Sequence, residues 1–269
     1  MLNFSSLLVG FVLSFRARYL WLASFSLLVL AVAVFLASMF SGRQPATVAL
    51  DIGLSVMRLL IPLIIVLMIQ ELVSREFDRR YFLNSLTYPR SRHQLLLSRF
   101  LTVVVLTNGL LFLMALLLAL LVRLIGQDYA QATPVALDYH YLLTISFMAV
   151  DLLILTALAC FLAVVSSTPS FVLIGTFGFM LVARSFSAIV ELLNRDASLV
   201  GNAESYRAGV GVLGYLLPDL GALDVRMVAL YGTLDFIPAD WFWLLLSSFA
   251  YIAGLLALAV WALQRKRFA

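Results

Sequence analysis

Six runs of apolar residues along the chain are long enough to cross a membrane as helices. An α-helix needs about 20 such residues to span the roughly 30 Å hydrocarbon core of a bilayer. The polar residues cluster between these runs, where the chain would meet water. The pattern predicts an all-α polytopic membrane protein, a single transmembrane domain over residues 1–269, with spans at Leu20–Phe40, Ile52–Ile69, Phe100–Val122, Tyr141–Val165, Phe171–Val190 and Trp241–Leu263.

Residues 1–19 carry a different pattern. Apolar side chains return there at helical spacing, from Leu7 and Leu8 through Phe11 to Phe15, with serines and arginines between them. This spacing favours an amphipathic helix that lies in the membrane interface. A cleaved signal peptide is the weaker interpretation, because neither a charged start nor a small-residue cleavage site is present.

The connection over residues 70–99 is long enough to carry a function or a structure of its own. Phe77, Tyr81, Phe82 and Leu86 share one helical face, and Pro89 ends this helix before a new one starts near Ser91 and runs into the third span. The connection therefore contains a short helix on the membrane surface. Its arginines either contact anionic lipid headgroups or, with the aromatic residues, form a docking element for a cytosolic partner.

The connection over residues 191–240 is also long, and its second half is unusually apolar. Proline, glycine and acidic residues nevertheless exclude a seventh crossing. We expect short helices that dip into the outer leaflet, either as a packed cap over the bundle or as a gate. The apolar residues concerned are Leu216, Leu217, Leu220, Leu223, Val225 and Val228.

Basic residues gather near both ends of the chain and in residues 70–99, whereas most acidic residues lie in the other connections. Positively charged loops stay in the cytoplasm, so both termini are predicted to be cytoplasmic. The high content of basic residues thus reflects membrane sidedness and does not indicate nucleic-acid binding.

Composition excludes several functions, since 64% of the residues are apolar and 12% are charged. Cys160 is the only cysteine, which excludes an intrachain disulfide, and the only histidines, His93 and His140, are too far apart for a zinc site. The only lysine is Lys266, near the C-terminus, so the chain has no phosphate-binding loop. We therefore predict that the chain is not an enzyme and binds no cofactor or metal.

Three charged residues fall within predicted spans: Arg58, Asp151 and Arg184. A charge at this depth costs about 2.5 to 3.5 kcal/mol on insertion scales and usually contacts protein or water. Either arginine is therefore expected to pair with Asp151 across helices. The group is either a structural ion pair or a lining for substrate or protons.

The loop between the second and third predicted spans resembles that of type-2 ABC transporter permeases, in which a short helix contacts a separate ATPase. Glu76, Leu83, Pro89, Ser91 and Arg92 carry the resemblance, although Arg80 stands where the family usually has glycine. The resemblance implies that the ATPase is contacted through Glu76, Tyr81, Phe82, Leu83, Leu86, Pro89 and Arg92.

Residues 215–232, together with the basic ending after Gln264, resemble the branch of these permeases that is linked to copper-enzyme maturation. This implies an outer gate, although the chain has no cluster of Cys, His or Met for copper. The implied gate residues are Leu217, Pro218, Asp219 and Asp224.

Together the resemblances imply the permease subunit of an ATP-driven exporter in a bacterial inner membrane. The chain would form a homodimer through its first and fifth spans and bind two ATPase subunits that hold ATP and Mg. Small residues such as Gly175 and Gly178 gather in these spans, where they serve either this contact or packing within one bundle. Two alternatives stay open: an ion-coupled secondary transporter that uses Asp151 and Arg58, and a membrane assembly factor without a transport path.

Overall fold

The structure is a computed structural model that describes residues 4–16, 18–74, 92–127, 135–166, 168–195 and 217–265. Within these residues, six helices are long and apolar enough to cross a membrane, which confirms the predicted all-helical polytopic fold. The described elements are α1 (Phe4–Arg16), α2 (Tyr19–Phe40), α3 (Pro45–Ile69), the π-helix η1 (Gln70–Ser74), α6 (Arg92–Gln127), α7 (Tyr139–Val165), α8 (Pro169–Arg195), α10 (Arg226–Tyr231), the 3₁₀-helix η3 (Leu234–Phe236) and α11 (Trp241–Arg265).

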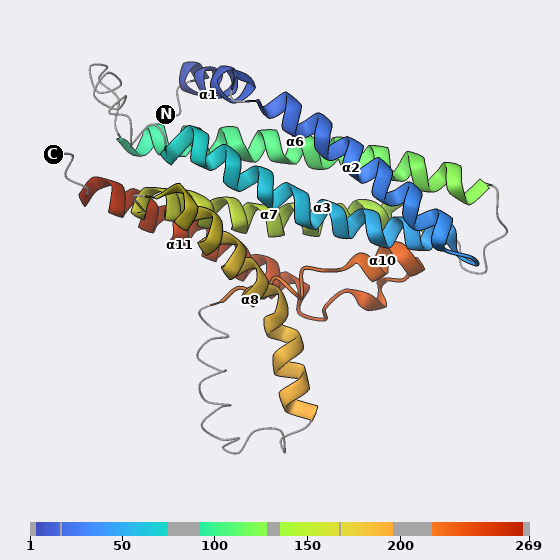
Figure 1. Cartoon of the computed structure of the whole chain (residues 1–269). Coiled ribbons are helices and arrows are strands. Elements are labelled where there is room, and N and C mark those ends of the chain that lie inside the picture. Colours follow the sequence, from blue (N-terminus) through green and yellow to red (C-terminus); the bar gives the residue numbers. More distant parts are fainter. Residues whose placement is uncertain are drawn as a thin grey trace.

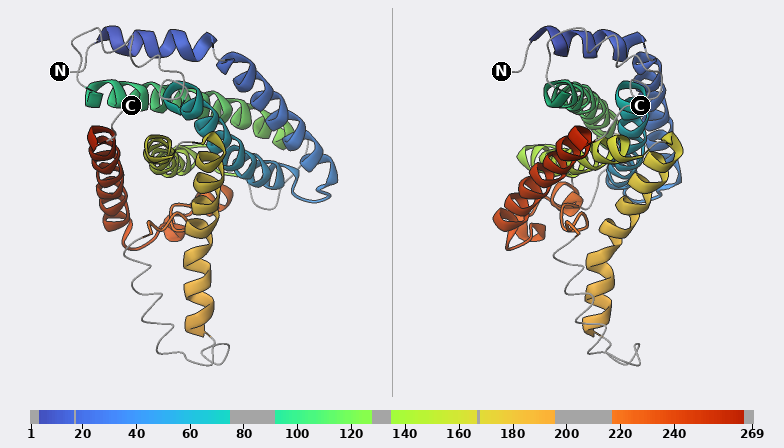
Figure 2. Two further views of the ribbon diagram at one scale, coloured as in Figure 1. Left: turned by 60° about the vertical axis from the view of Figure 1, so that its left-hand side comes forward. Right: turned by 90° about the vertical axis from the view of Figure 1, so that its left-hand side faces the viewer.

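The long helices form one bundle with two distinct ends (Figure 1). Helix α1 and the C-terminal end of α11 lie at one end, and α10 lies at the opposite end. The C-terminal half of α8 extends away from the other helices, as both views of Figure 2 show. Both ends of the described chain therefore lie on the same side of the bundle.

Helix α7 is the centre of the bundle, because it packs against α3, α6, α8 and α11. Within the most apolar window of each span, 72% of the residues of α7 are buried, compared with 22% for α2, α8 and α11. The peripheral helices turn large apolar side chains outward, such as Phe35, Ile174 and Trp243. This exposure suits a surface that faces lipid rather than water.

Several helices are longer than the apolar runs predicted. Helix α3 begins at Pro45 instead of Ile52, with proline in the first turn, where its missing N–H costs no helical bond. Helix α6 runs without interruption from Arg92 to Gln127, which confirms that a new helix starts near Ser91 and enters the third span. The predicted spans are too short because they were limited to apolar runs, whereas these helices continue through polar residues.

Helix α1 is present and packs against α6 at a close approach. A Cβ atom at Gly10 would lie 2.4 Å from Oγ1 of Thr102, so only glycine allows this contact without a shift. The predicted position of α1 in the membrane interface stays a prediction. The predicted surface helix over Phe77–Leu86 lies outside the described residues.

Residues 217–240, here called the cap segment, form α10, η3 and connecting turns. Four of the apolar residues singled out above, Leu220, Leu223, Val225 and Val228, are buried in one cluster with side chains of α7, α8 and α11. The cap segment therefore packs onto the bundle. Insertion of its helices into a leaflet stays a prediction.

Candidate functional site

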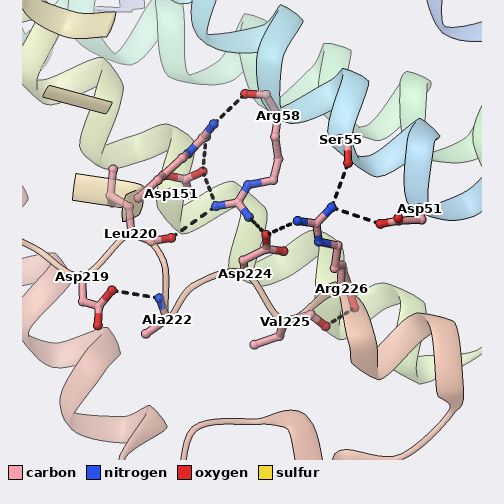
Figure 3. A network of polar contacts seen from close by, with 12 residues as sticks. Asp51, Ser55, Arg58, Asp151, Asp219, Leu220, Ala222, Asp224, Val225 and Arg226 are labelled. Carbon is pink, nitrogen blue, oxygen red and sulfur yellow. Dashed lines mark hydrogen bonds and ion pairs between the residues drawn. The ribbon is translucent and has the colours of Figure 1, made fainter. Parts of the chain in front are cut away.

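The three charged residues predicted within spans meet in one place (Figure 3). Oδ2 of Asp151 on α7 lies 2.6 Å from Nη2 of Arg184 on α8 and 3.4 Å from Nη2 of Arg58 on α3. The Asp151 side chain is fully buried. The expected pairing is confirmed, and both arginines take part in it.

The cap segment adds a second acid to this site. Asp224 forms an ion pair with Nη1 of Arg58, and the main-chain carbonyl of Leu220 accepts a hydrogen bond from Nη2 of the same arginine at 3.2 Å. Arg58 thus joins α3, α7 and the cap segment through a single guanidinium group.

Arg226, the first residue of α10, ties the cap segment to α3 a second time. Its Nη1 donates to Asp51 at 3.0 Å and to Oγ of Ser55 at 2.8 Å, while its Nη2 lies 3.2 Å from Asp224. Asp51, Ser55 and Arg58 follow one another at spacings of four and three residues, which places them on one face of α3. The described network therefore holds α3 against the cap segment along about two helical turns.

Pro62 explains a further contact of Arg184. In a regular helix the N–H of residue 62 would bond to the carbonyl of Arg58, but proline has no N–H. Nη1 of Arg184 donates to that carbonyl at 3.1 Å. Arg184 therefore joins α8 both to the main chain of α3 and to the carboxylate of α7.

Charges alternate through the network, in the order Asp151, Arg58, Asp224, Arg226 and Asp51. The exposed fraction of these side chains rises in the same order, from 0% at Asp151 to 45% at Asp51. Burial of an ion pair costs several kcal/mol per ion in desolvation, and loss of one partner from such a pair typically costs about 3–5 kcal/mol. The inner pairs are consequently sensitive to small changes in geometry.

The network is only partly satisfied. Oδ1 of Asp151 and Nε of both Arg58 and Arg184 have no hydrogen-bond partner within the described part of the chain. Polar networks with free members are less rigid than fully bonded ones. The network contains three acids and three arginines, and its unpaired atoms leave room for an ion pair to change partners.

The predicted gate residues divide into two groups. Asp224 belongs to the charge network, whereas Asp219 accepts a hydrogen bond from the main-chain N–H of Ala222 at 2.9 Å and shapes a turn. The carbonyl of Pro218 accepts from Leu220 in the same turn, and Leu217 is half-buried. Only one of the four therefore contacts the spans through its charge.

The sequence interpretation missed Asp51, Ser55 and Arg226. The helical spacing of Asp51, Ser55 and Arg58 was a usable signal, hidden because the second span was expected to begin after Asp51. Among the residues predicted to contact an ATPase, Arg92 begins α6, and Glu76, Tyr81, Phe82, Leu83, Leu86 and Pro89 lie outside the described residues.

His140 and Cys160 serve packing and helix capping rather than the charge network. Cys160 is fully buried in the core. Nδ1 of His140 lies 2.7 Å from Oδ1 of Asp138, which also accepts the His140 main-chain N–H at the start of α7. These hydrogen bonds with His140 hold the pKa of Asp138 below its ordinary value. Within the described residues, no group of three or more His, Cys, Asp or Glu is placed to hold a metal ion.

Comparison with known proteins gave one family match. The family described as ABC-2 family transporter protein matches residues 15–193, which extend from the end of α1 through nearly all of α8. No curated protein matches the sequence. Membrane domains of this family have no ATPase activity of their own and generally pair with separate nucleotide-binding ATPases. Because the match covers more than half of the 269 residues, this chain belongs to the ABC-2 family of transporters as a membrane component without its own ATPase.

Proposed function

We propose that this chain is the permease subunit of an ATP-driven exporter, a single transmembrane domain in which the cap segment is the outer gate. The observation that carries the proposal is the charge network, which fastens the cap segment to α3 through Arg58 and Arg226. Burial of its apolar residues against α7, α8 and α11 supports a closed state of this proposed gate.

The type of contact supports a gate more than a permanent cap. Hydrogen bonds depend on donor–acceptor distance and angle, so a displacement of one helix weakens them. Arg58 contacts two carboxylates and one carbonyl, so a shift of α3 alters all three contacts together. A purely apolar cap would lack such a common release point.

Helix α3 also provides a route for force. It carries Asp51, Ser55 and Arg58 toward one end and continues at its other end into η1, which directly precedes residues 75–91. We place the contact with the ATPase in that connection, through Glu76, Tyr81, Phe82, Leu83, Leu86, Pro89 and Arg92. Closure of the ATPase pair would then move the same helix that holds the gate.

The proposed assembly is a homodimer in a bacterial inner membrane, with cytoplasmic termini and two ATPase subunits that hold ATP and Mg. The largely exposed surfaces of α2 and α8 support a subunit interface there. The small residues of α8 have two roles: Gly175 packs closely against Leu162 of α7, whereas a Cβ at Gly178 would meet nothing within 4 Å. Gly178 therefore supports the interface and Gly175 does not.

The membrane sides follow from the charges. Basic residues gather at the bundle end that holds α1 and the end of α11, which makes that end cytoplasmic under the positive-inside rule. The cap segment then faces the opposite compartment, as export requires of an exit gate. The link to copper-enzyme maturation rests on residues 215–232 and on the basic ending, and it is a narrower form of the same proposal.

A reconstitution experiment tests the proposal. The chain is purified together with a coexpressed nucleotide-binding ATPase, and ATP hydrolysis is compared between the wild type and the double variant Tyr81→Ala, Phe82→Ala. We expect the variant to lose copurification and the stimulation of ATPase turnover. The matched control replaces two lipid-facing residues, Phe112→Ala and Phe242→Ala, and should behave as wild type.

The alternatives give different outcomes. Transport by the purified chain alone, driven by an ion gradient and abolished in Asp151→Asn, would establish the secondary carrier. An unchanged ATPase interaction in the double variant would place the contact elsewhere and overturn the coupling proposal.

A further inference from the structure

A pocket of about 310 Å³ lies away from the charge network, where three spans meet near α1. Its walls come from the start of α2, the end of α3 with η1, and the start of α8. Nε2 of Gln70 donates to the carbonyl of Pro169 at 2.8 Å and so joins η1 to α8 along one wall. The lining residues are Arg18, Trp21, Leu22, Leu67, Met68, Gln70, Glu71 and Pro169.

The lining is divided by polarity. Leu22 and Leu67 come from within two spans and provide accessible apolar surface, and Met68 beside them is fully buried. Arg18 precedes the first span, and Gln70 and Glu71 belong to η1 at the end of the second. A pocket with an apolar side along the spans and a polar side at their ends matches the polarity of the bilayer at the headgroup level.

Arg18 is the feature that suggests a ligand. Its side chain is exposed and has no ion-pair or hydrogen-bond partner within the described part of the chain. Its φ of 67° is the only positive φ of a non-glycine residue among those described. This strained conformation separates α1 from α2, and it places an unpaired guanidinium at the pocket.

Trp21 supports a lipid-exposed position for the pocket. Its side chain is 64% exposed and stacks on Phe25, with the ring centroids 5.5 Å apart. Tryptophan is enriched where a membrane protein crosses from hydrocarbon to headgroups. The exposed Trp21 therefore favours a pocket that opens to the membrane near the headgroups.

We infer that this pocket binds one glycerophospholipid of the surrounding leaflet, with its phosphate on Arg18 and its upper acyl chain on Leu22 and Leu67. Arginine binds phosphate through charge-assisted, often bidentate, hydrogen bonds. The volume is at the lower end of the 300–1,000 Å³ typical of ligand pockets, so it accommodates the headgroup region while the acyl chains continue along the spans.

The inference goes beyond the proposed function, because it requires only that the helices lie in a membrane. It is tested on the full chain in detergent by native mass spectrometry, with titration of phosphatidylethanolamine. We expect the wild type to retain one lipid at lipid concentrations where other bound lipids are lost. In Arg18→Gln the affinity for this lipid should fall at least about tenfold, because a hydrogen bond to a charged group contributes enough binding free energy for such a change.

Two further variants sharpen the test. Arg43→Gln removes an exposed arginine just beyond the other end of α2 and should leave the retained lipid unchanged. Leu67→Trp fills the pocket from its apolar side and should remove the lipid with Arg18 intact. Equal retention in the wild type, Arg18→Gln and Leu67→Trp would overturn the inference.

Fluorescence separates a lipid from free phosphate. A form with Trp241, Trp243 and Trp261 each changed to Phe leaves Trp21 as the only tryptophan. Phosphatidylethanolamine with brominated acyl chains should quench Trp21 with saturation at one lipid per chain. Complete displacement of this lipid by inorganic phosphate would show a site for the anion alone and contradict lipid binding.

Discussion

The guanidinium of Arg184 donates a hydrogen bond to the main-chain carbonyl of Arg58 over 3.1 Å. A side chain on α8 thereby replaces the helical donor that Pro62 removes from α3. Proline inside a helix leaves such a carbonyl free, and neighbouring helices commonly satisfy it in membrane proteins. Pro62 and Arg184 are consequently parts of one arrangement.

This relationship predicts energetic coupling between Pro62 and Arg184. In Arg184→Lys the charge beside Asp151 is kept, but lysine lacks the planar fork that serves two acceptors at once. We expect this change to cost less stability in a Pro62→Ala background, where the main chain again bonds the Arg58 carbonyl. A double-mutant cycle on unfolding in mixed micelles should give a coupling of about 0.5–3 kcal/mol. Strict additivity would contradict the arrangement.

The burial of Asp151 predicts a large loss of stability when this residue is replaced. Asp151→Ala leaves Arg58 and Arg184 in the spans with one shared partner fewer, and we expect the free energy of unfolding to fall by about 3–5 kcal/mol. Asp235→Ala, which removes an exposed acid of η3, should have little effect. Equal stability of the two variants would show that the inner pairs contribute nothing.

The outer part of the network predicts gate opening. Arg226→Gln removes the contacts with Asp51 and Asp224, and exposed pairs of this kind contribute roughly 0.2–1 kcal/mol each. In a Cys160→Ala background with Val225→Cys, a buried position of the cap segment, thiol labelling reports opening. Arg226→Gln should raise the labelling rate about fivefold, given about 1 kcal/mol.

The matched control for labelling is Asp235→Asn in the same background. It lies in the cap segment but is exposed and outside the network. An equal rise in the labelling rate in both variants would mean that charge changes anywhere in the segment loosen it, and the network would lose its role as a latch.

The approach of α1 to α6 predicts a strict requirement for glycine. Gly10→Ala places a methyl group against Thr102, whose hydroxyl is already bonded to the carbonyl of Ser98 at 2.8 Å. Overpacking of this kind costs about 1–3 kcal/mol. The control Gly254→Ala meets nothing within 4 Å and should keep or raise stability. Thermal unfolding in detergent compares them, and equal behaviour would contradict close packing at α1.

The lowered pKa of Asp138 predicts that the stability of the protein depends on pH. Its pKa is held down in the folded state by the hydrogen bonds with His140, so its stabilising contribution is complete above the ordinary value of about 3.9 and is lost as the pH falls below it. The difference in melting temperature between wild type and Asp138→Asn should therefore be larger at pH 7 than near pH 3. A difference that grows toward low pH would reverse the sign and exclude this cause.

The sequence predicted the spans well because apolar runs of about twenty residues are rare outside membrane-crossing helices. It also predicted that Arg58, Asp151 and Arg184 would find one another, since an unpaired charge in a span is too costly. It did not predict the contact of Arg226 with Asp51, 175 residues away. Charges in connections are inexpensive in water, and only the folded cap segment shows that these two are needed together.

The order of synthesis gives the cap segment one more role. Arg58 is made 93 residues before Asp151, and Arg184 follows before Asp224 leaves the ribosome. Until then the buried centre of the network holds Arg58 and Arg184 against the single carboxylate of Asp151. Asp224 supplies the second carboxylate for Arg58, so a nascent chain that ends before residue 224 keeps one excess positive charge at this centre, and the cap segment completes its charge balance during synthesis.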